Sequence, residues 1–525
     1  MTIAEMLARN ARMYSDDPAL IELRPSAGVR KEITWREFDE RVNKVANALI
    51  DRGVRKGDKV IHWMMNSINW LEAYFGIIRT GAWAVPLSFR FTSEDLKYCA
   101  DIAEAQAMIL GEEFTERAEA IRSQLGTIKN YIFIGQTMPK GMDCFEDMIS
   151  SSSSRPVDVG LNDQDECALY FTSGTTGTPK PILLTHKNME CAAIAENYNH
   201  CVRHSDNFLL LQPLYHTGGK MHWFGSLIVG GQATLLCERI TPQNIFEAVH
   251  KERATKAMML VPWIQDILTA LDRGELKKED YDLSCWRLMH SGAQPVPASL
   301  IKRWKEYFPN MQYDTDYGLG EAAGPGCVHL GMENEHKVGA IGKASFNWEA
   351  RIVNEQGENV AQGEIGELVV KGNGVMKGYY KNPEKTAETI KGGWLYTGDM
   401  ARMDGEGFIY LVDRKKDVVI TGGENIYPVE VESVLHSHPK IYDVGIIGIP
   451  DERLGEIALA VIAPKPGETL TEEEVNRFCE QNLPRYKRPR RIVFDKVPRN
   501  PTGKIEKPKL RQKYTGWRRV LEPRA

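Results

Sequence analysis

The sequence predicts an α/β fold: a large N-terminal domain of parallel-rich sheets, followed by a small C-terminal α+β domain. Through the first four hundred residues, short apolar runs alternate with longer segments whose apolar residues recur at helical spacing. This alternation is typical of mostly parallel sheets with helices on their faces. Beyond residue 345 the pattern changes to short β-rich pieces separated by glycine turns, and a second α/β pattern begins after residue 417.

The N-terminal domain contains the clearest strands and helices. We expect strands at the short apolar runs 59–63, 107–110, 131–134, 168–171 and 207–211. We expect helices at the amphipathic segments 35–52, 92–103 and 114–125. The serine run 150–154 with Arg155-Pro156 is expected to be a flexible connector.

The later part of the chain divides into two units. Segments 350–353, 366–371 and 407–412 predict a small antiparallel, β-barrel-like subdomain. After the polar stretch 413–417, helices are expected at 429–437 and 471–482, the second with a capping-box start, and strands at 443–449 and 457–464. We therefore assign residues 1–413 to the N-terminal domain, 414–416 to a hinge and 417–525 to a mobile C-terminal domain.

Composition limits the classes of function. The chain has 525 residues, 42% of them apolar, and a formal net charge of −5, which gives no overall basic field for nucleic acid. Its nine cysteines are scattered and include no C-x-x-C pair, which favours a reducing, cytoplasmic location over a disulfide framework or a zinc site. No run approaches the roughly eighteen apolar residues of a membrane helix, so we expect no integral membrane association, while peripheral contact stays open.

The strongest local signal follows the strand at 168–171. The chain enters a loop of small hydroxyl residues and glycines that ends at a lysine; its members are Thr172, Ser173, Gly174, Thr175, Thr176, Gly177 and Lys180. Glycines let the backbone approach an anion, and free N–H groups and hydroxyls donate to phosphate oxygens. It is not a Walker loop, because Lys180 follows a proline and no Ser or Thr follows it. An ordinary Ser/Gly-rich loop is the alternative, and the ordered pattern favours phosphate binding.

Further short blocks follow in order along the chain. They are Pro213-Leu-Tyr-His216, Ser291-Gly-Ala-Gln-Pro295, Asp316-Tyr-Gly-Leu-Gly-Glu321, Tyr396-Thr-Gly-Asp399, Asp413-Arg414, Gly422-Gly-Glu-Asn-Ile-Tyr-Pro428 and Asn500-Pro-Thr-Gly-Lys504. Together they resemble the adenylate-forming superfamily of acyl-CoA synthetases, firefly-type luciferases and peptide-synthetase adenylation domains. The resemblance spans residues 170–504, and the first 150 residues match only in general character.

The resemblance implies an ATP-dependent acid–thiol ligase. A carboxylic acid and ATP would give an acyl-adenylate and pyrophosphate, and coenzyme A would then displace AMP. The second half-reaction would follow rotation of the C-terminal domain. Because the acyl-phosphate anhydride and the thioester are close in free energy, the enzyme could also run in reverse to make ATP.

The resemblance assigns the nucleotide contacts. Driving a carboxylate onto the α-phosphorus joins two anions, so fixed positive charge is needed, and Lys504 matches the family's adenylation lysine. Asp399 would accept hydrogen bonds from both ribose hydroxyls, and Arg414 would contact ribose or phosphate. Tyr317 would stack on adenine. The remaining residues expected to line the nucleotide are Gly292, Ala293, Gln294, Asp316, Gly318 and Gly320.

Magnesium is expected at Glu321, with Thr176 as a further ligand, because Mg²⁺ takes a few carboxylates plus phosphate oxygens and water. Two positions depart from the family pattern. Gly320 stands where threonine is common, and Pro181 stands where glycine is common. The first departure puts one phosphate contact in doubt.

The coenzyme A step should use the C-terminal domain. Lys416 occupies the hinge position, where a solvated side chain tolerates a change of backbone dihedrals. Gly422 and Gly423 would line a narrow pantetheine channel, and the basic residues Arg485 and Lys487 are candidates for the coenzyme A phosphates, although such runs are usually plain solvated surface.

The acid is expected to bind near His216, whose alternative role is to cap a helix. Lys220, Trp263 and Ala322 are further candidates for the acyl pocket. Trp263 would shorten the pocket and favour small, branched or cyclic acids. Lys220 either points away or meets a polar group of the substrate, since a bare ammonium in an apolar pocket is costly.

Three rival functions remain. One is an amino-acid or aryl-acid adenylation enzyme that loads a carrier protein, but no aspartate stands near His216 to pair an α-ammonium group, and no carrier domain follows Lys504. Another is a luciferase-like oxygenase that uses the same adenylate. A regulator with a dead site is disfavoured because the charged residues of the blocks are all present. A homodimer is compatible with the sequence, which does not identify the acid.

Overall fold

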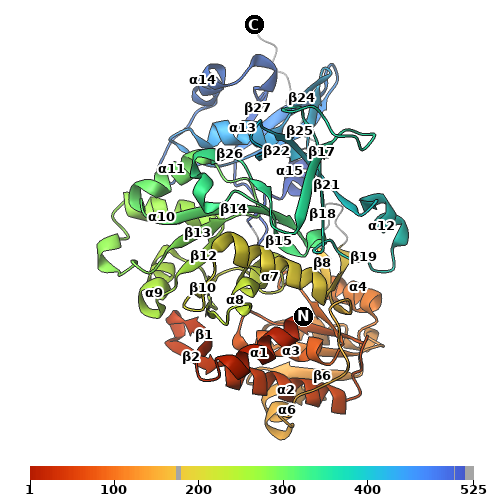
Figure 1. Cartoon of the computed structure of the whole chain (residues 1–525). Coiled ribbons are helices and arrows are strands. Elements are labelled where there is room, and N and C mark those ends of the chain that lie inside the picture. The colour runs from red at the N-terminus through yellow and green to blue at the C-terminus, as the bar shows by residue number, and fades with distance from the viewer. Residues whose placement is uncertain (173–178, 502, 515–525) are drawn as a thin grey trace.

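The computed structural model describes residues 1–172, 179–501 and 503–514. In Figure 1 the chain starts among the helices of one end of the molecule and finishes in a C-terminal unit at the opposite end, with helix α7 near the middle. The predicted α/β class is confirmed: helices pack against two large parallel-rich sheets, and two smaller sheets follow.

The first large sheet is eight-stranded, in the order β19-β9-β8-β4-β3-β5-β6-β7. Its strands are β3 (Lys59–Trp63), β4 (Trp83–Pro86), β5 (Ala107–Gly111), β6 (Asn130–Ile134), β7 (Asp143–Cys144), β8 (Glu166–Thr172), β9 (Lys180–Thr185) and β19 (Gly378–Tyr379). Strands β3 to β8 pair in parallel, whereas β9 runs antiparallel to both β8 and β19.

The second large sheet is nine-stranded, in the order β16-β15-β14-β13-β12-β10-β11-β1-β2. Its strands are β1 (Pro18–Arg24), β2 (Val29–Thr34), β10 (Asn207–Leu210), β11 (Gln232–Leu236), β12 (Lys256–Met259), β13 (Leu288–Ser291), β14 (Gln312–Leu319), β15 (Gly324–His329) and β16 (Lys343–Ala344). The centre is parallel, and the antiparallel pairs lie at its two edges.

The helices of these two layers are α1 (Ile3–Met13), α2 (Trp35–Asp51), α3 (Ile68–Arg79), α4 (Ser93–Ala103), α5 (Thr115–Glu119), α6 (Phe145–Ser151), α7 (His186–His200), α8 (Thr217–Leu227), α9 (Pro242–Glu252), α10 (Val261–Asp272) and α11 (Ala298–Tyr307). Threonine capping boxes start α2 at Thr34, α4 at Thr92 and α7 at Thr185, satisfying N–H groups that lack an intrahelical partner. Apolar side chains of α3, α7 and α8 join residues of both large sheets in one buried core. Helix α7 therefore lies at the junction of the two sheets.

Two expected segments differ in the structure. The helix expected at 114–125 is broken into a 3₁₀ turn, the short α5 and a second 3₁₀ turn, and no side chain caps the start of α5. The apolar residues of this segment are mostly buried although they lie in separate short turns. Apolar residues at helical spacing therefore do not by themselves indicate a continuous helix. The expected connector begins later than the serine run, because α6 extends to Ser151.

The third sheet is antiparallel and contains the pieces expected after residue 345. Its strands are β17 (Trp348–Val353), β18 (Gly366–Gly372), β20 (Ile390–Lys391), β21 (Trp394–Met403) and β22 (Ile409–Arg414). Helix α12 (Pro383–Thr389) precedes β20. Strand β22 ends at Arg414, which is opposite Asp399 in the β21–β22 register.

The fourth sheet is made entirely from the C-terminal part of the chain. Its strands are β23 (Val419–Thr421), β24 (Glu424–Ile426), β25 (Ile441–Asp451), β26 (Gly455–Pro464) and β27 (Arg491–Phe494), and the helices beside it are α13 (Pro428–His436), α14 (Glu472–Asn482) and α15 (Lys507–Tyr514). The expected capping box of α14 is present at Thr471. This unit has its own apolar core.

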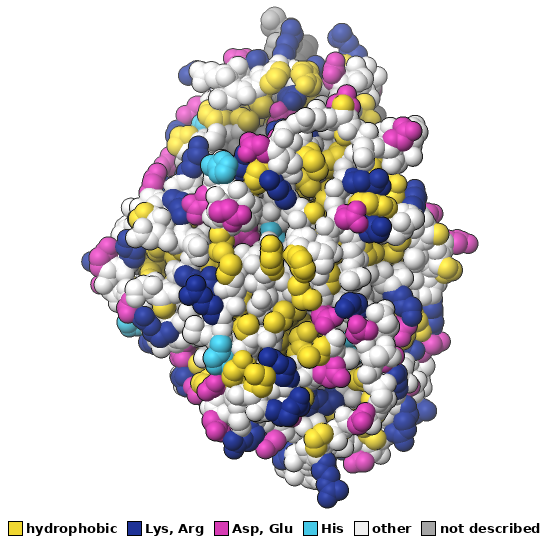
Figure 2. Space-filling view, in the orientation of Figure 1, with side chains coloured by type: hydrophobic (Ala, Val, Ile, Leu, Met, Phe, Trp, Pro, Cys, Tyr) yellow, Lys and Arg dark blue, Asp and Glu magenta, His cyan; other side chains and the backbone are white. Residues whose placement is uncertain are grey.

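Polar contacts join the C-terminal unit to the rest of the molecule. Tyr442 Oη donates to Asp266 Oδ1 at 3.0 Å, and Arg273 Nη2 donates to the Pro466 carbonyl at 3.2 Å. Arg499 Nη1 donates to Gln294 Oε1 at 2.5 Å. On the face shown in Figure 2, basic and acidic side chains are interspersed over both parts. Among the helices of the described ranges, none combines the length and apolar character needed to cross a membrane.

Candidate active site

The phosphate-loop prediction falls on a hairpin between β8 and β9. Thr172 and Lys180 are opposite one another in the antiparallel register, so they hold the two ends of the loop together. The predicted residues Ser173, Gly174, Thr175, Thr176 and Gly177 lie outside the described residues. Lys180 Nζ lies 5.8 Å from the centre of the Tyr379 ring.

Glu321 stands beside this hairpin. Tyr379 Oη donates to Glu321 Oε1 at 2.8 Å, so one tyrosine lies next to both Lys180 and the predicted magnesium ligand. Tyr379 is not among the residues predicted from the sequence; it stands in the Gly378-Tyr379 pair, which forms the short strand β19 against β9. Gly320 precedes Glu321, and a Cβ at Gly320 would lie 2.9 Å from Ile182 Cδ1. Ile182 therefore occupies the space that a larger residue at 320 would need.

The predicted adenine segment Gly292–Gln294 leaves the end of β13 close to β14. A Cβ at Gly292 would lie 2.2 Å from Asp316 Oδ1, so only glycine fits there. Asp316 itself faces protein: its Oδ1 lies 3.0 Å from His290 Nε2, and its Oδ2 accepts from Gly326 N at 3.2 Å. Asp316 therefore packs against Gly292, and its two oxygens are engaged with His290 and Gly326.

Tyr317, Asp399 and Arg414 are brought together as the blocks predict. Tyr317 Oη donates to Asp399 Oδ2 at 2.6 Å, and Arg414 Nε lies 3.2 Å from Asp399 Oδ1. Burial, together with the nearby Asp399 carboxylate, raises the pKa of Tyr317 well above its usual value, so this hydroxyl stays a donor. A carboxylate offers about four acceptor positions, so Asp399 retains capacity for further hydroxyl donors. Gly318 lies in the same strand as Tyr317.

Lys504 reaches these residues from the C-terminal unit. Its turn is closed by Lys504 N donating to Asn500 Oδ1 at 2.9 Å, and Gly503 adopts φ +79°, which glycine tolerates. A Cβ at Gly503 would lie 3.6 Å from Gln294 Oε1. Burial and then the positive charge of Arg414 lower the pKa of Lys504 to about 8, while Asp399, Glu321 and Asp316 act in the opposite direction. The charges of three separate sequence blocks thus act on one lysine.

The lowered pKa of Lys504 gives a pH prediction. A lysine with a pKa near 8 is charged below that pH and neutral above it, so kcat/KM for acyl-adenylate formation should fall as pH rises through about 8. Pyrophosphate release measured from pH 6.5 to 9.5 should show one descending limb. Lys504→Arg, whose guanidinium stays charged, should lose this limb even if its rate is lower. A limb that persists in the arginine variant would assign it to another group.

His216 is the N-cap of α8. Its Nδ1 accepts from Gly218 N at 3.1 Å, so the capping role considered for it is present, and its other nitrogen is left for a further contact. Burial and the nearby Lys504 lower its pKa to about 3. His216 is therefore neutral at physiological pH and lies within electrostatic reach of Lys504.

The other predicted acyl-pocket residues have different surroundings. Lys220 is fully buried, donates to the Leu214 carbonyl at 3.1 Å, and lies over the rings of Trp70, Tyr74 and Tyr170. Its ammonium is thus enclosed by protein groups, and burial lowers its pKa well below the usual value. Trp263 is partly buried at the start of α10. Ala322 is fully buried in the core around Tyr317.

The predicted coenzyme A residues lie on the surface of the C-terminal unit. Gly422 and Gly423 form the tip of the β23–β24 hairpin, with φ of +59° and +88°, and both are exposed. The turn alone therefore requires glycine at these positions. Lys487 Nζ is paired with both oxygens of Glu430, at 2.6 and 2.7 Å, whereas Arg485 is exposed. Lys416 is exposed in the turn that follows β22.

The family model described as AMP-binding enzyme matches residues 7–380, and that of the AMP-binding enzyme C-terminal domain matches residues 430–504. A feruloyl-CoA synthase of Amycolatopsis sp is 34% identical over 92% of this chain and 94% of its own length. The long-chain-fatty-acid–CoA ligase FadD13 of Mycobacterium tuberculosis is 30% identical over 98% of each chain.

A solved structure of similar shape is that of the anthranilate CoA ligase AuaEII in complex with anthranoyl-AMP. It has a TM-score of 0.89 and 28% sequence identity, and the match covers 98% of this chain and 97% of that one. The family models together with relatives of nearly full length confirm the expected resemblance and disfavour the rival functions. The chain belongs to the AMP-binding enzyme family, in its acyl-CoA synthetase branch, and is an ATP-dependent, AMP-forming acid–CoA ligase.

Proposed function

We propose that this ligase activates a compact or aromatic carboxylic acid at the site where Lys504 meets Asp399, Arg414 and Glu321. In the first half-reaction a carboxylate oxygen attacks the α-phosphorus of ATP, the bond to the β-phosphate oxygen breaks, and pyrophosphate leaves. In the second, the thiolate of coenzyme A attacks the acyl carbon and AMP leaves. The observation that carries this assignment is the placement of Lys504, from the C-terminal unit, among charged residues of the N-terminal blocks.

Each residue has a role in the first half-reaction that its contacts support. Lys504 neutralises the approach of two anions, and it is half-buried, where its charge is less screened than in water. Asp399, already oriented by Tyr317 and Arg414, binds the ribose hydroxyls. Gly292, Ala293 and Gln294 border the adenine on the side opposite Tyr317, and Lys180 contacts the phosphates.

The residues present suit a magnesium ion. Glu321 offers one carboxylate whose Oε1 is held by Tyr379, leaving its other oxygen for a cation, and Mg²⁺ completes its shell from phosphate oxygens and water. When bound, the ion would neutralise charge on the phosphates. Thr176 is the further predicted ligand.

The second half-reaction requires the C-terminal unit to turn about residues 414–416. The exposed Lys416 can change its dihedrals while remaining solvated, and the polar contacts between the units can be exchanged for water. The turn would withdraw Lys504 and bring Gly422 and Gly423 to the acyl group, where their lack of side chains would leave a passage for pantetheine. Arg485 is the freer of the two proposed phosphate contacts, since Lys487 is paired with Glu430.

The proposed acid class rests on Trp263 and on the relatives. Trp263 is partly buried between two apolar cores, where its ring can limit the length of a bound acid. Relatives and similar structures named for feruloyl and anthranilate substrates are consistent with an aromatic acid. A long-chain acid is the competing choice, because another relative is named as a long-chain-fatty-acid ligase.

A panel of acids tests the assignment. Aromatic and short branched acids should release pyrophosphate with ATP and Mg²⁺, and acyl-CoA should accumulate when coenzyme A is added. Trp263→Ala should shift the preference towards longer chains, because removing the indole lengthens the pocket. Pyrophosphate release without any thioester would contradict coenzyme A transfer, and a wild-type preference for long chains would contradict the acid class.

Location and assembly are also proposals. All nine cysteines, which lie in the described ranges, are free thiols, as suits the reducing cytoplasm. A homodimer stays a prediction, and light scattering of the purified chain would decide it.

A further inference from the structure

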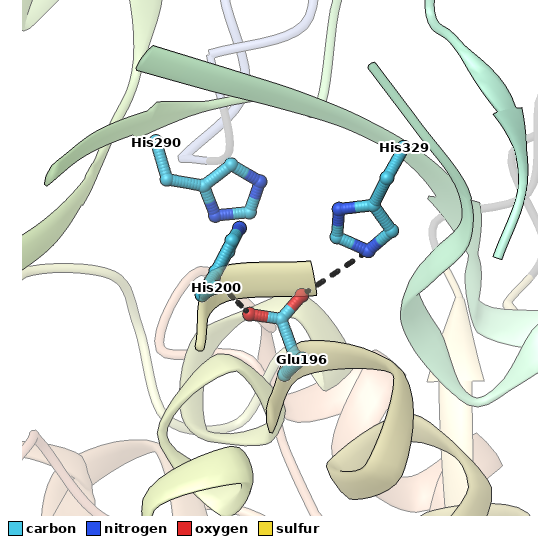
Figure 3. A group of neighbouring side chains, drawn as sticks. All are labelled: Glu196, His200, His290 and His329. Carbon is cyan, nitrogen blue, oxygen red and sulfur yellow. Dashed lines mark ion pairs between the residues drawn. The ribbon is translucent and has the colours of Figure 1, made fainter. Parts of the chain in front are cut away.

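A cluster of histidines and carboxylates is buried behind the nucleotide site. Glu196 and His200 lie one turn apart on α7, His290 lies on β13, and His329 ends β15. Figure 3 shows the four side chains converging on a common space from the helix and the strands. Three of the four are 0% exposed and His329 is 3% exposed. None of them has a role in the reaction proposed above.

The polar atoms that face this space have charged neighbours but few hydrogen bonds of good geometry. Both oxygens of Glu196, both nitrogens of His290 and Nε2 of His329 are buried without a hydrogen bond of good geometry among the described residues. Two of these atoms do have an ion-pair neighbour outside the group of four: Glu196 Oε2 lies 3.2 Å from His222 Nδ1, and His290 Nε2 lies 3.0 Å from Asp316 Oδ1. Leaving one such group unsatisfied costs about 1–3 kcal/mol, so the atoms need either protons on the histidines or a bound cation to satisfy them.

The backbone keeps the space open. Gly326 has φ +89°, and a Cβ there would lie 2.8 Å from His329 Nε2 and 3.6 Å from Glu196 Oε1. A side chain at this position would therefore fill the space next to two of the unsatisfied atoms.

Distances and second contacts suit a metal ion. One donor atom from each of the four residues can be chosen so that all lie within 4.8 Å of one another. Glu196 Oε2 lies 3.2 Å from His200 Nδ1, and Glu196 Oε1 lies 3.7 Å from His329 Nε2. Tetrahedral ligands at about 2.0–2.1 Å from zinc are separated by about 3.4 Å, so small side-chain adjustments suffice.

Asp314, from strand β14, orients two of the rings. Its Oδ2 lies 3.0 Å from His200 Nε2 and 2.7 Å from His329 Nδ1, so the opposite nitrogen of each ring faces Glu196. A carboxylate behind a histidine in this way is the usual outer contact of a metal-binding imidazole.

The charges of the cluster favour a divalent cation. Three buried carboxylates, Glu196, Asp314 and Asp316, are accompanied by one ammonium, that of Lys256, whose Nζ lies 3.1 Å from His200 Nδ1. One divalent ion balances these charges with all the histidines neutral. The alternative is that two histidines carry protons, which balances the same charges without a metal. If a metal binds to His200 Nδ1, the Lys256 ammonium must give up its contact with that nitrogen.

We propose that Glu196, His200, His290 and His329 bind a divalent transition-metal ion of the zinc class at a structural site. Three imidazole nitrogens and a carboxylate oxygen suit zinc, whereas Mg²⁺ and Ca²⁺ prefer oxygen donors alone. With four protein ligands no position stays open for a substrate, so the ion is structural. It clamps α7, which follows directly from β9 and Lys180, to β13, which leads directly into Gly292.

Metal content tests the proposal without an activity assay. The chain is expressed in medium supplemented with Zn²⁺ or Co²⁺, because a buried site must be loaded during folding, and is purified without chelators. Wild type should carry about one equivalent per chain, and Glu196→Gln and His329→Gln should each fall to roughly a tenth of that. His62→Gln, which alters a fully buried histidine outside the cluster, should keep the full equivalent.

Each other outcome contradicts the proposal. Metal-free wild type would show that the cluster holds protons. Loss of metal in His222→Gln with retention in His329→Gln would place the ion at the neighbouring group of Glu196, His222, His290 and Asp316 instead. If circular dichroism shows that a variant does not fold, the proposal is tested on the cobalt-loaded wild type. Its visible spectrum must then show the absorption bands of tetrahedral Co²⁺.

Discussion

Replacing Lys504 by alanine is expected to slow acyl-adenylate formation by about 10²- to 10³-fold, the size of effect seen when one preorganised electrostatic group is removed. The half-buried ammonium lies within reach of Asp399, Glu321 and Arg414 in the conformation described here. Transfer of the acyl group from supplied acyl-AMP to coenzyme A should stay within a few-fold of wild type, because that step has no phosphate encounter to neutralise.

The two half-reactions must be measured separately. Pyrophosphate release reports adenylation, and thioester formation from synthetic acyl-AMP reports transfer. Lys509→Ala is the matched control, because Lys509 is an exposed lysine of the same unit that pairs with Glu506, and both rates should be unchanged. Equal losses in both half-reactions of Lys504→Ala would remove Lys504 from the adenylation step.

Lys416→Pro should lower overall acyl-CoA synthesis on the order of 10²-fold while preserving adenylation. The turn after β22 is closed by Asp417 N and Val418 N, which both donate to the Arg414 carbonyl at 2.8 and 3.2 Å. Neither bond uses the Lys416 nitrogen, so proline removes no donor from the turn, and its ring fixes φ and opposes rotation at this residue. The domain arrangement that places Lys504 in the site should therefore persist.

Lys416→Ala separates the loss of charge from the loss of rotation. Its backbone stays free, so both half-reactions and overall turnover should resemble wild type. Full turnover in Lys416→Pro would show that the units do not turn at this residue, and loss of adenylation would show that proline distorts the turn itself.

Much of the fold could be predicted because local patterns and tertiary packing agree. The run 59–63 is strand β3 residue for residue, and the helix expected at 471–482 begins beside its predicted cap at Thr471. The segment 114–125 shows what periodicity cannot predict. Its apolar spacing is compatible both with one continuous helix and with the several short turns that it forms. Breaks of this kind depend on packing that periodicity does not record.

Residues that belong to short motifs could be assigned to the candidate site from the sequence, and their roles stay predictions. The meeting of Asp399, Arg414 and Tyr317 follows from their blocks, whereas the contacts of Tyr379 and Arg499 do not. The surroundings of Lys220 depend on three rings that come from two other elements, α3 and β8. Of the histidine cluster, only Glu196 and His200 are linked by local sequence, because they are four residues apart on one helix. His290 and His329 join them only through the register of strands β13, β14 and β15.

Gln294 belongs to two contacts at once. Its side-chain oxygen accepts from Arg499 of the C-terminal unit, and its backbone is part of the segment proposed to border adenine. A residue shared in this way makes nucleotide affinity and domain docking reciprocal: by whatever factor docking strengthens ATP binding, ATP must strengthen docking. Release of pyrophosphate, which removes part of that affinity, would then weaken docking and favour departure of the C-terminal unit without any separate signal.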